Sequence, residues 1–211
     1  HKIGSHSDLV CFSFHPRKVI TTGDGGMITT NNESYRDRIK LLRQHAMSVN
    51  DRVRHESDKV IFEDHIELGY NYRMTDIQAA VGIKQLEKLD KIVEERRKIA
   101  IQYHKAFKDI AVIRLPVEKE GYFSNYQSYS IYLKPECKIS RNDLMQAMLD
   151  IGISTRRGIT TAHRETAYKN YQSSYHLPIS EDASDRSIVI PLYYPMEQKD
   201  INYIIETFRT L

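Results

Sequence analysis

The residues best suited to chemistry lie in one stretch, CFSFHPRKVITTGDGG, which runs from Cys11 to Gly26. An apolar, β-prone run ends there at Ser-Phe-His, and Pro16 then begins a turn that carries Lys18. A lysine that bonds covalently to a carbonyl group needs a rigid element to aim it, and a strand end supplies one. It also needs a base to take its proton, and the neighbouring sequence shows none. The stretch predicts a cofactor site, and a solvated loop lysine is the plainer alternative.

Glycines follow the lysine closely, at Gly23, Gly25 and Gly26. Glycine lets the backbone fold tightly or approach a ligand, so this run fits a ligand-binding turn and an ordinary tight turn equally well. Small polar side chains on such a turn provide the neutral donors that a phosphate group needs, without bulk.

A second motif, GYNYRMT, covers Gly69 to Thr75 and stands directly before a strong helical pattern. Thr75 is a natural N-cap, and apolar residues recur behind it at helical spacing. The guanidinium group of Arg73 is suited to bidentate contacts with two oxygen atoms. A salt bridge at the start of the helix is the alternative role for the same side chain.

A third polar segment, residues 155–164, contains Arg157 and His163, and we take both as candidate substrate-binding residues. A surface cation pair is the alternative. Neither the histidines nor the two cysteines have the spacing of a metal site, so no metal is predicted.

Short strands and helices are predicted to hold the first two motifs, within residues 1–90. The sequence predicts a buried strand over 9–14, a strand over 27–30, a helix capped by Asn32 or Ser34 that runs toward His45, an aperiodic polar loop over 46–65, and a helix after Thr75.

Residues 91–211 predict a small α+β domain with mixed strands, and we place a soft boundary near Asp90. The expected elements are a charged helix over 90–108, a strand over 128–133, a helix from Ser140 to Asp150, a strand over 152–155, a short helix from 180 that leads into a strand over 188–190, and a last helix over 199–210.

Two motifs carry a resemblance to a known family. SFHPRKVITTGDGGMI resembles the lysine motif of the DegT/StrS-type sugar aminotransferases, which depend on pyridoxal 5'-phosphate (PLP) and have fold type I. Asp24 stands where many members carry Glu. GYNYRMTDIQAAVGIKQLEKLD resembles the family's second motif, and the end of the chain, from Leu177 to Pro195 and the last helix, fits its closing pattern. The resemblance covers essentially the whole chain.

The resemblance implies an α/β fold in two parts. Residues 1–90 would be the later part of a fold-type-I PLP-binding large domain, with helices on a mixed, mainly parallel sheet, and residues 91–211 the small C-terminal α+β domain. The family's carboxylate for the pyridinium nitrogen and its ring-stacking group would fall before His1. We therefore expect the C-terminal part of a longer protein, not competent for catalysis alone.

The resemblance also implies roles for individual residues. Lys18 would form the internal aldimine with PLP, and Ser13 would bond to the cofactor phosphate. Asn71 would reach the phosphate of the neighbouring subunit's cofactor, so that a homodimer shares its active sites. Arg73 would meet the substrate's pyrophosphate, while Arg157 and His163 lie in a segment that approaches the sugar in the family.

The expected activity is transfer of an amino group from an amino acid, glutamate, to a keto group of a nucleotide-linked deoxysugar, for polysaccharide or glycan biosynthesis. Lysine at position 18 argues against the family's sugar dehydratases, in which the resembling position is histidine. A non-catalytic truncated fragment, or a dimerising or sensory module of the same fold, is the alternative.

Composition narrows the choice of partners. With 31 Lys and Arg against 28 Asp and Glu, the net charge is only +3, which does not predict a nucleic-acid or membrane partner. Two cysteines form no disulfide framework, and no apolar stretch reaches the roughly 20 residues of a membrane span. We therefore expect a cytoplasmic protein that binds small molecules.

Overall fold

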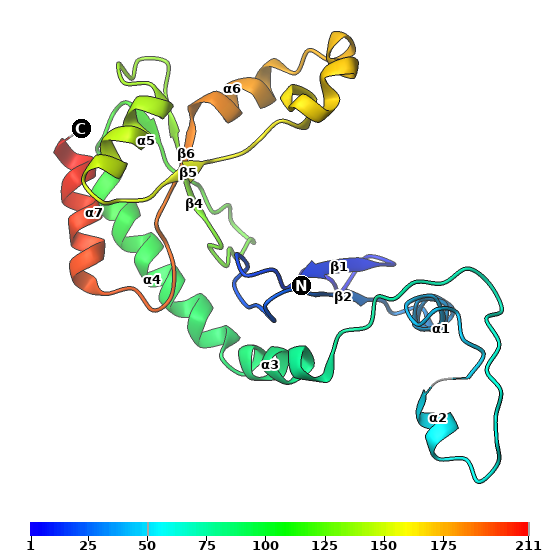
Figure 1. The fold of residues 1–211 in the computed structure, drawn as a ribbon. Coiled ribbons are helices and arrows are strands. Elements are labelled where there is room, and N and C mark those ends of the chain that lie inside the picture. The colour runs from blue at the N-terminus through cyan, green and yellow to red at the C-terminus, as the bar shows by residue number, and fades with distance from the viewer. Residues whose placement is uncertain (50, 211) are drawn as a thin grey trace. The chain divides into compact units, whose positions relative to one another are not determined.

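The computed structural model describes residues 1–49 and 51–210 and divides the chain into two compact units (Figure 1). The first unit is His1–Leu89 and the second begins at Asp90. We describe each by itself. No helix in the described part of the chain is both long and apolar enough to cross a membrane.

The first unit contains a two-stranded ribbon and three helices. Strand β1 (Val10–Ser13) pairs antiparallel with β2 (Gly26–Thr29), and Ser13 stands opposite Gly26 at the end of the ladder. The helices are α1 (Glu33–Leu42), α2 (Asp51–His55) and α3 (Asp76–Leu86). The predicted strands and helices are confirmed here, and the aperiodic loop gains one short helix.

One expectation for this ribbon is wrong. The strand that reads as buried has exposed or half-buried side chains, with Phe12 37% exposed. A two-stranded ribbon has too few neighbours to cover both of its faces. The β1–β2 pair is antiparallel because its connection contains a turn and no helix, whereas a parallel pair needs a crossover connection.

The chain after α1 is fixed by a contact with residues far along the sequence. Asn32 caps α1 by accepting from the N–H groups of Ser34 and Tyr35, at 2.9 and 3.3 Å. Beyond Leu42 the backbone reverses, and residues 42–45 form hydrogen bonds with residues 70–72. Gly69 passes so close to this reversal that a Cβ atom on it would lie 2.2 Å from the backbone nitrogen of Ala46.

The second unit is built on a four-stranded antiparallel sheet with the order β3-β4-β6-β5. Its strands are β3 (Ile113–Arg114), β4 (Tyr129–Leu133), β5 (Arg156–Arg157) and β6 (Ser187–Ile190). Its helices are α4 (Leu89–Phe107), α5 (Arg141–Asp150), α6 (Pro178–Arg186) and α7 (Gln198–Thr210), with 3-10 turns at Ala162–Arg164 and Thr166–Ser174.

The core of this unit lies between the sheet and the helices α4, α5 and α7, while α6 lies against the other face (Figure 1). Alternate side chains of β4 point into the core, and Tyr132 between them donates to Asp182 of α6 at 2.6 Å. The largest fully buried side chains are Tyr103, Phe107, Tyr129, Ile131, Met148, Ile188 and Ile190.

The sheet differs from the expectation in two ways. The strand expected over 152–155 is wrong, because Gly152 and Ile153 are used to reverse the chain: their N–H groups bond to the last carbonyls of α5. Pairing starts only at Arg156, opposite Val189. The mixed strands are also wrong for the described residues, since every pair in this sheet is antiparallel.

A buried arginine ties this unit together. Arg96 lies on the apolar side of α4 and is 7% exposed. Its guanidinium donates to three backbone carbonyls, those of Tyr126 (2.9 Å), Gln127 (2.6 Å) and Leu192 (2.9 Å). Burial lowers the pKa of Arg96 from its ordinary value. The side chain thus joins α4 to the entry of β4 and to the exit of β6.

We predict that Arg96→Met lowers the free energy of unfolding by about 3 kcal/mol, because one buried carbonyl and two partly buried carbonyls lose a charged donor. Urea unfolding followed by far-ultraviolet circular dichroism measures this, since the chain contains no Trp. The control is Lys98→Met on the same helix, which removes ion pairs with Glu94 and Glu95 that are exposed to solvent. That change should cost less than about 1 kcal/mol. Equal losses in the two variants would contradict the assigned role.

Candidate functional site

Backbone hydrogen bonds fix the turn that carries Lys18. The Lys18 N–H donates to the carbonyl of His15 at 2.9 Å and closes a tight turn. At the base of this loop, the carbonyl of Phe14 accepts from the Thr22 N–H at 3.1 Å and from the Thr21 hydroxyl at 2.7 Å. Lys18 therefore projects from a short loop whose two ends are joined.

The glycines after Lys18 serve the turn itself. Gly25 has a φ of +145°, and a Cβ atom on it would lie 2.7 Å from the Thr22 hydroxyl oxygen, so a side chain is excluded. Gln78 of α3 donates to the carbonyl of Asp24 at 2.9 Å, which anchors the loop to the start of α3. The Asp24 carboxylate accepts from the Gly25 N–H at 2.9 Å. The contacts of these glycines are those of an ordinary tight turn, the second of the two interpretations that the sequence allows.

Ser13 and Lys18 stand on the same strand end, and both are exposed. The Ser13 hydroxyl oxygen accepts only a long contact, 3.4 Å, from the His15 N–H, so its own O–H is available to an acceptor. A primary amine suits an aldehyde carbon, and a hydroxyl donor suits a phosphate oxygen. The donor set at this strand end therefore fits PLP.

Asn71 and Arg73 lie in the extended segment 69–74, which is held at both ends. Asn71 forms an isolated antiparallel bridge with Gln44, and Thr75 begins α3 with a capping box shared with Gln78. Tyr70 and Tyr72 stack on each other, with ring centroids 5.1 Å apart. Side chains alternate along an extended chain, so Asn71 and Arg73 are presented on the opposite side from the tyrosines. Both are exposed.

Arg157 lies on the edge strand β5 of the second unit and is exposed. Burial lowers the pKa of Arg141, and the positive charge of Arg157 lowers it further. Gly158 follows directly, where a Cβ atom would lie 2.2 Å from the hydroxyl oxygen of Ser187. The backbone at Arg157 is thereby pressed onto β6.

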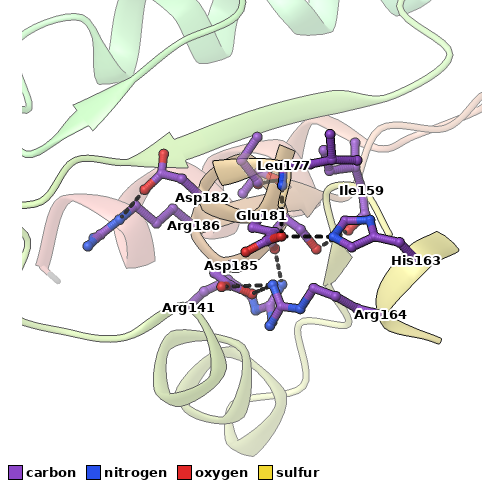
Figure 2. A network of polar contacts seen from close by, with 12 residues as sticks. Arg141, Ile159, His163, Arg164, Leu177, Glu181, Asp182, Asp185 and Arg186 are labelled. Atoms are coloured by element: carbon purple, nitrogen blue, oxygen red, sulfur yellow. Dashed lines mark hydrogen bonds and ion pairs between the residues drawn. The ribbon is translucent and has the colours of Figure 1, made fainter. Parts of the chain in front are cut away.

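His163 lies in the 3-10 turn Ala162–Arg164 and is bound to α6 (Figure 2). Its Nε2 lies 2.9 Å from Oε1 of Glu181, and the Leu177 N–H donates to the same oxygen at 3.2 Å. These two contacts hold the pKa of Glu181 below its ordinary value, and the contact with His163 has the larger effect. The His163 side chain is only 12% exposed.

His163 also lines a hollow of about 720 Å³ in the second unit. The lining residues are Ile159, Thr160, Thr161, Ala162, His163, Tyr168, Tyr175, Leu177 and Ser180. Two tyrosines and several hydroxyl groups therefore surround a space large enough for an organic ligand.

The candidate residues thus lie in two pairs along the chain, Ser13 with Lys18 and Asn71 with Arg73, and at two separate positions, Arg157 and His163. Sequence reasoning missed Glu181. Nothing in the sequence distinguishes this carboxylate from the other acids of α6, because its partner lies 18 residues away across an irregular segment.

Comparison with solved structures defines the class of protein. A Streptococcus pneumoniae protein classed as a sugar aminotransferase, in its PLP form, matches with a TM-score of 0.85 and 26% identity over 100% of this chain and 53% of its own. Helicobacter pylori PseC, an aminotransferase involved in pseudoaminic acid biosynthesis, matches with a TM-score of 0.84 and 25% identity over 100% of this chain and 56% of its own. The fold is the fold-type-I architecture of PLP-dependent aminotransferases, over about half of those chains.

The chain belongs to the DegT/DnrJ/EryC1/StrS aminotransferase family, which residues 1–209 match. A curated relative from Campylobacter jejuni, UDP-4-amino-4,6-dideoxy-N-acetyl-beta-L-altrosamine transaminase, is 34% identical over 206 residues. That match covers 98% of this chain and 53% of the relative, so the chain spans about half the length of the curated relatives it matches.

We predict that Gly69→Ala opens the junction between residues 42–46 and 70–72, because a Cβ atom meets backbone that no side-chain rotation can move. The expected cost is about 3 kcal/mol in the first unit. Hydrogen exchange of the Tyr70 and Tyr72 amides measures the opening. The control is Gly121→Ala, where φ is +80° and a Cβ atom meets nothing within 4 Å. Protection of those two amides equal to that of the unchanged protein would contradict the steric argument.

Proposed function

We propose that the protein containing this chain is a PLP-dependent transaminase that moves an amino group from glutamate to the keto group of a nucleotide-linked deoxysugar. Family membership supports the reaction class. The observation that carries the assignment to this chain is Lys18, an exposed amine on the closed turn that follows β1, the strand that ends at Ser13 with its hydroxyl free to donate. The Campylobacter relative supports the substrate class, since its printed name is that of a UDP-sugar transaminase.

Lys18 is the residue that would hold the cofactor covalently, and Ser13 would donate to its phosphate. The bound cofactor would supply an electron sink for the carbanion that forms when the donor Cα loses a proton. Lys18 Nζ would accept that proton and would deliver a proton to the carbon of the sugar in the second half-reaction.

The other candidate residues bind and orient the reactants. Asn71 would reach the cofactor phosphate of a second copy, which makes the functional unit a homodimer. Arg73 would contact the pyrophosphate, as its fork of N–H donors fits two oxygens at once. Arg157 and His163 would contact the sugar side. The reaction is proposed for the cytoplasm, and the product for polysaccharide or glycan synthesis.

We predict that Lys18→Ala abolishes covalent attachment of PLP to the purified protein. Borohydride reduction followed by peptide mass spectrometry should show the cofactor on the peptide that contains Lys18 in the unchanged protein, and no adduct in the variant. Arg17→Ala, on the same turn, is the control and should keep the adduct. An adduct that persists in Lys18→Ala would contradict the assignment. The absence of any adduct in the unchanged protein would favour the non-catalytic alternative.

The shared active site predicts complementation between two inactive variants. Lys18→Ala and Asn71→Ala are unfolded, mixed in equal amounts and refolded with PLP. If Asn71 serves the partner's Lys18, each mixed dimer has one site with both residues, and about a quarter of the activity of the unchanged protein returns. If both residues serve one site within a subunit, no mixed dimer contains an intact site and activity stays absent. Each variant refolded alone is the control.

A further inference from the structure

Glu181 holds His163 through an oxygen that is fixed from two sides (Figure 2). Its Oε1 accepts from the Leu177 N–H at 3.2 Å and lies 2.9 Å from His163 Nε2. The Glu181 side chain is 29% exposed and that of His163 is 12% exposed, so the contact is partly shielded from water. The carboxylate orientation therefore does not depend on His163 alone.

The ionisation of Glu181 determines which ring nitrogen carries a proton. The contacts with His163 and Leu177 lower the pKa of Glu181, so the carboxylate is ionised at neutral pH. An ionised carboxylate only accepts hydrogen bonds, so the hydrogen bond to His163 requires a proton on Nε2. In the neutral ring Nδ1 then carries the lone pair. Nδ1 makes no hydrogen bond to any residue that the structure describes.

The hollow beside His163 has the chemistry of a carbohydrate site. Tyr168 and Tyr175 offer flat apolar faces for the C–H side of a sugar ring, and Thr160, Thr161 and Ser180 offer hydroxyl groups. The nearest cation in sequence, Arg164, is already engaged by both carboxylate oxygens of Asp185, at 2.9 and 3.0 Å. These contacts favour the neutral sugar ring over the diphosphate as the group bound here.

We propose that Glu181 is a positioning residue that keeps His163 in its Nε2–H form, so that Nδ1 accepts a hydrogen bond from a hydroxyl group of the sugar bound in this hollow. This proposal rests on the proposed function, because it places the sugar reactant there. A purely structural role is the competing explanation: the pair would only clamp the 3-10 turn to α6.

The chain provides a matched control for that explanation. Asp185 lies one turn after Glu181 on α6, and it binds Arg164, the residue next to His163. Asp185→Asn weakens the same clamp without touching the imidazole. Glu181→Leu keeps much of the side-chain volume but has no acceptor, so nothing in its place dictates which nitrogen is protonated. Glu181→Gln would not serve, because its amide oxygen would keep the Leu177 N–H and would still accept from Nε2–H.

The first measurement is the tautomer of His163 in cofactor-loaded protein labelled with ¹⁵N-histidine, by long-range ¹H–¹⁵N correlation, with the signal assigned from His163→Gln. The unchanged protein and Asp185→Asn should show the Nε2–H form. Glu181→Leu should show a mixture of the two tautomers. A His163 signal in the Nδ1–H form in the unchanged protein, or one that is unaltered in Glu181→Leu, would overturn the positioning role. This measurement is independent of any activity.

The second measurement adds UDP-N-acetylglucosamine as the sugar probe. The Nδ1 signal should shift in the unchanged protein and in Asp185→Asn, with binding weaker in Glu181→Leu by up to about fivefold, the loss of one neutral hydrogen bond. No shift of Nδ1 up to the solubility of the probe would overturn the sugar assignment, as would equal weakening in Glu181→Leu and Asp185→Asn. Failure of the proposed function is a separate result, namely the absence of amino transfer despite the expected tautomer and shift.

Discussion

The carbonyl oxygen of Phe14 controls the geometry of the loop on which the proposed chemistry depends. It accepts from both the N–H of Thr22 and the hydroxyl of Thr21, and so joins the two ends of the loop that carries Lys18. Ordering the backbone of an open loop when a ligand binds would cost conformational entropy. Closure by these contacts places that backbone cost in folding, so the position of the Lys18 backbone is set before any ligand arrives.

Hydrogen bonds also fix the irregular segments that carry the other candidate residues. Asn71 stands in a segment that is held to residues 42–45 by backbone hydrogen bonds, and the capping box of Thr75 fixes where that segment ends. His163 is fixed by a carboxylate that a backbone N–H also holds. In each case an irregular segment presents a polar side chain, and contacts distant in sequence make that segment rigid.

The sequence was informative where chemistry is local. The start of α1 near Asn32, the helix that follows Ser140, the long charged helix α4 and the glycine turn after Lys18 depend on neighbouring residues, and the structure has them where the pattern predicts. Contacts between distant segments were not predictable. The pairing of β5 starts later than expected because residues 152 and 153 cap α5 first, and Arg96 of α4 satisfies carbonyls up to 96 residues away.

Most of the arginines discussed in the second unit are already bound to other groups, which limits the cations that could bind an anionic reactant. Arg96 is committed to carbonyls, Arg97 to Glu118 and Arg164 to Asp185. On β5, Arg156 and Arg157 form no ion pair within the described part of the chain, and strand alternation points them to opposite faces. Only one of them can therefore face a given reactant, and the choice of Arg157 remains a prediction. A cation at this edge suits a carboxylate or a phosphate, whereas the histidine held by Glu181 suits a hydroxyl group. If both proposed contacts form, the recognition of charge and the recognition of hydroxyl groups would fall to different side chains.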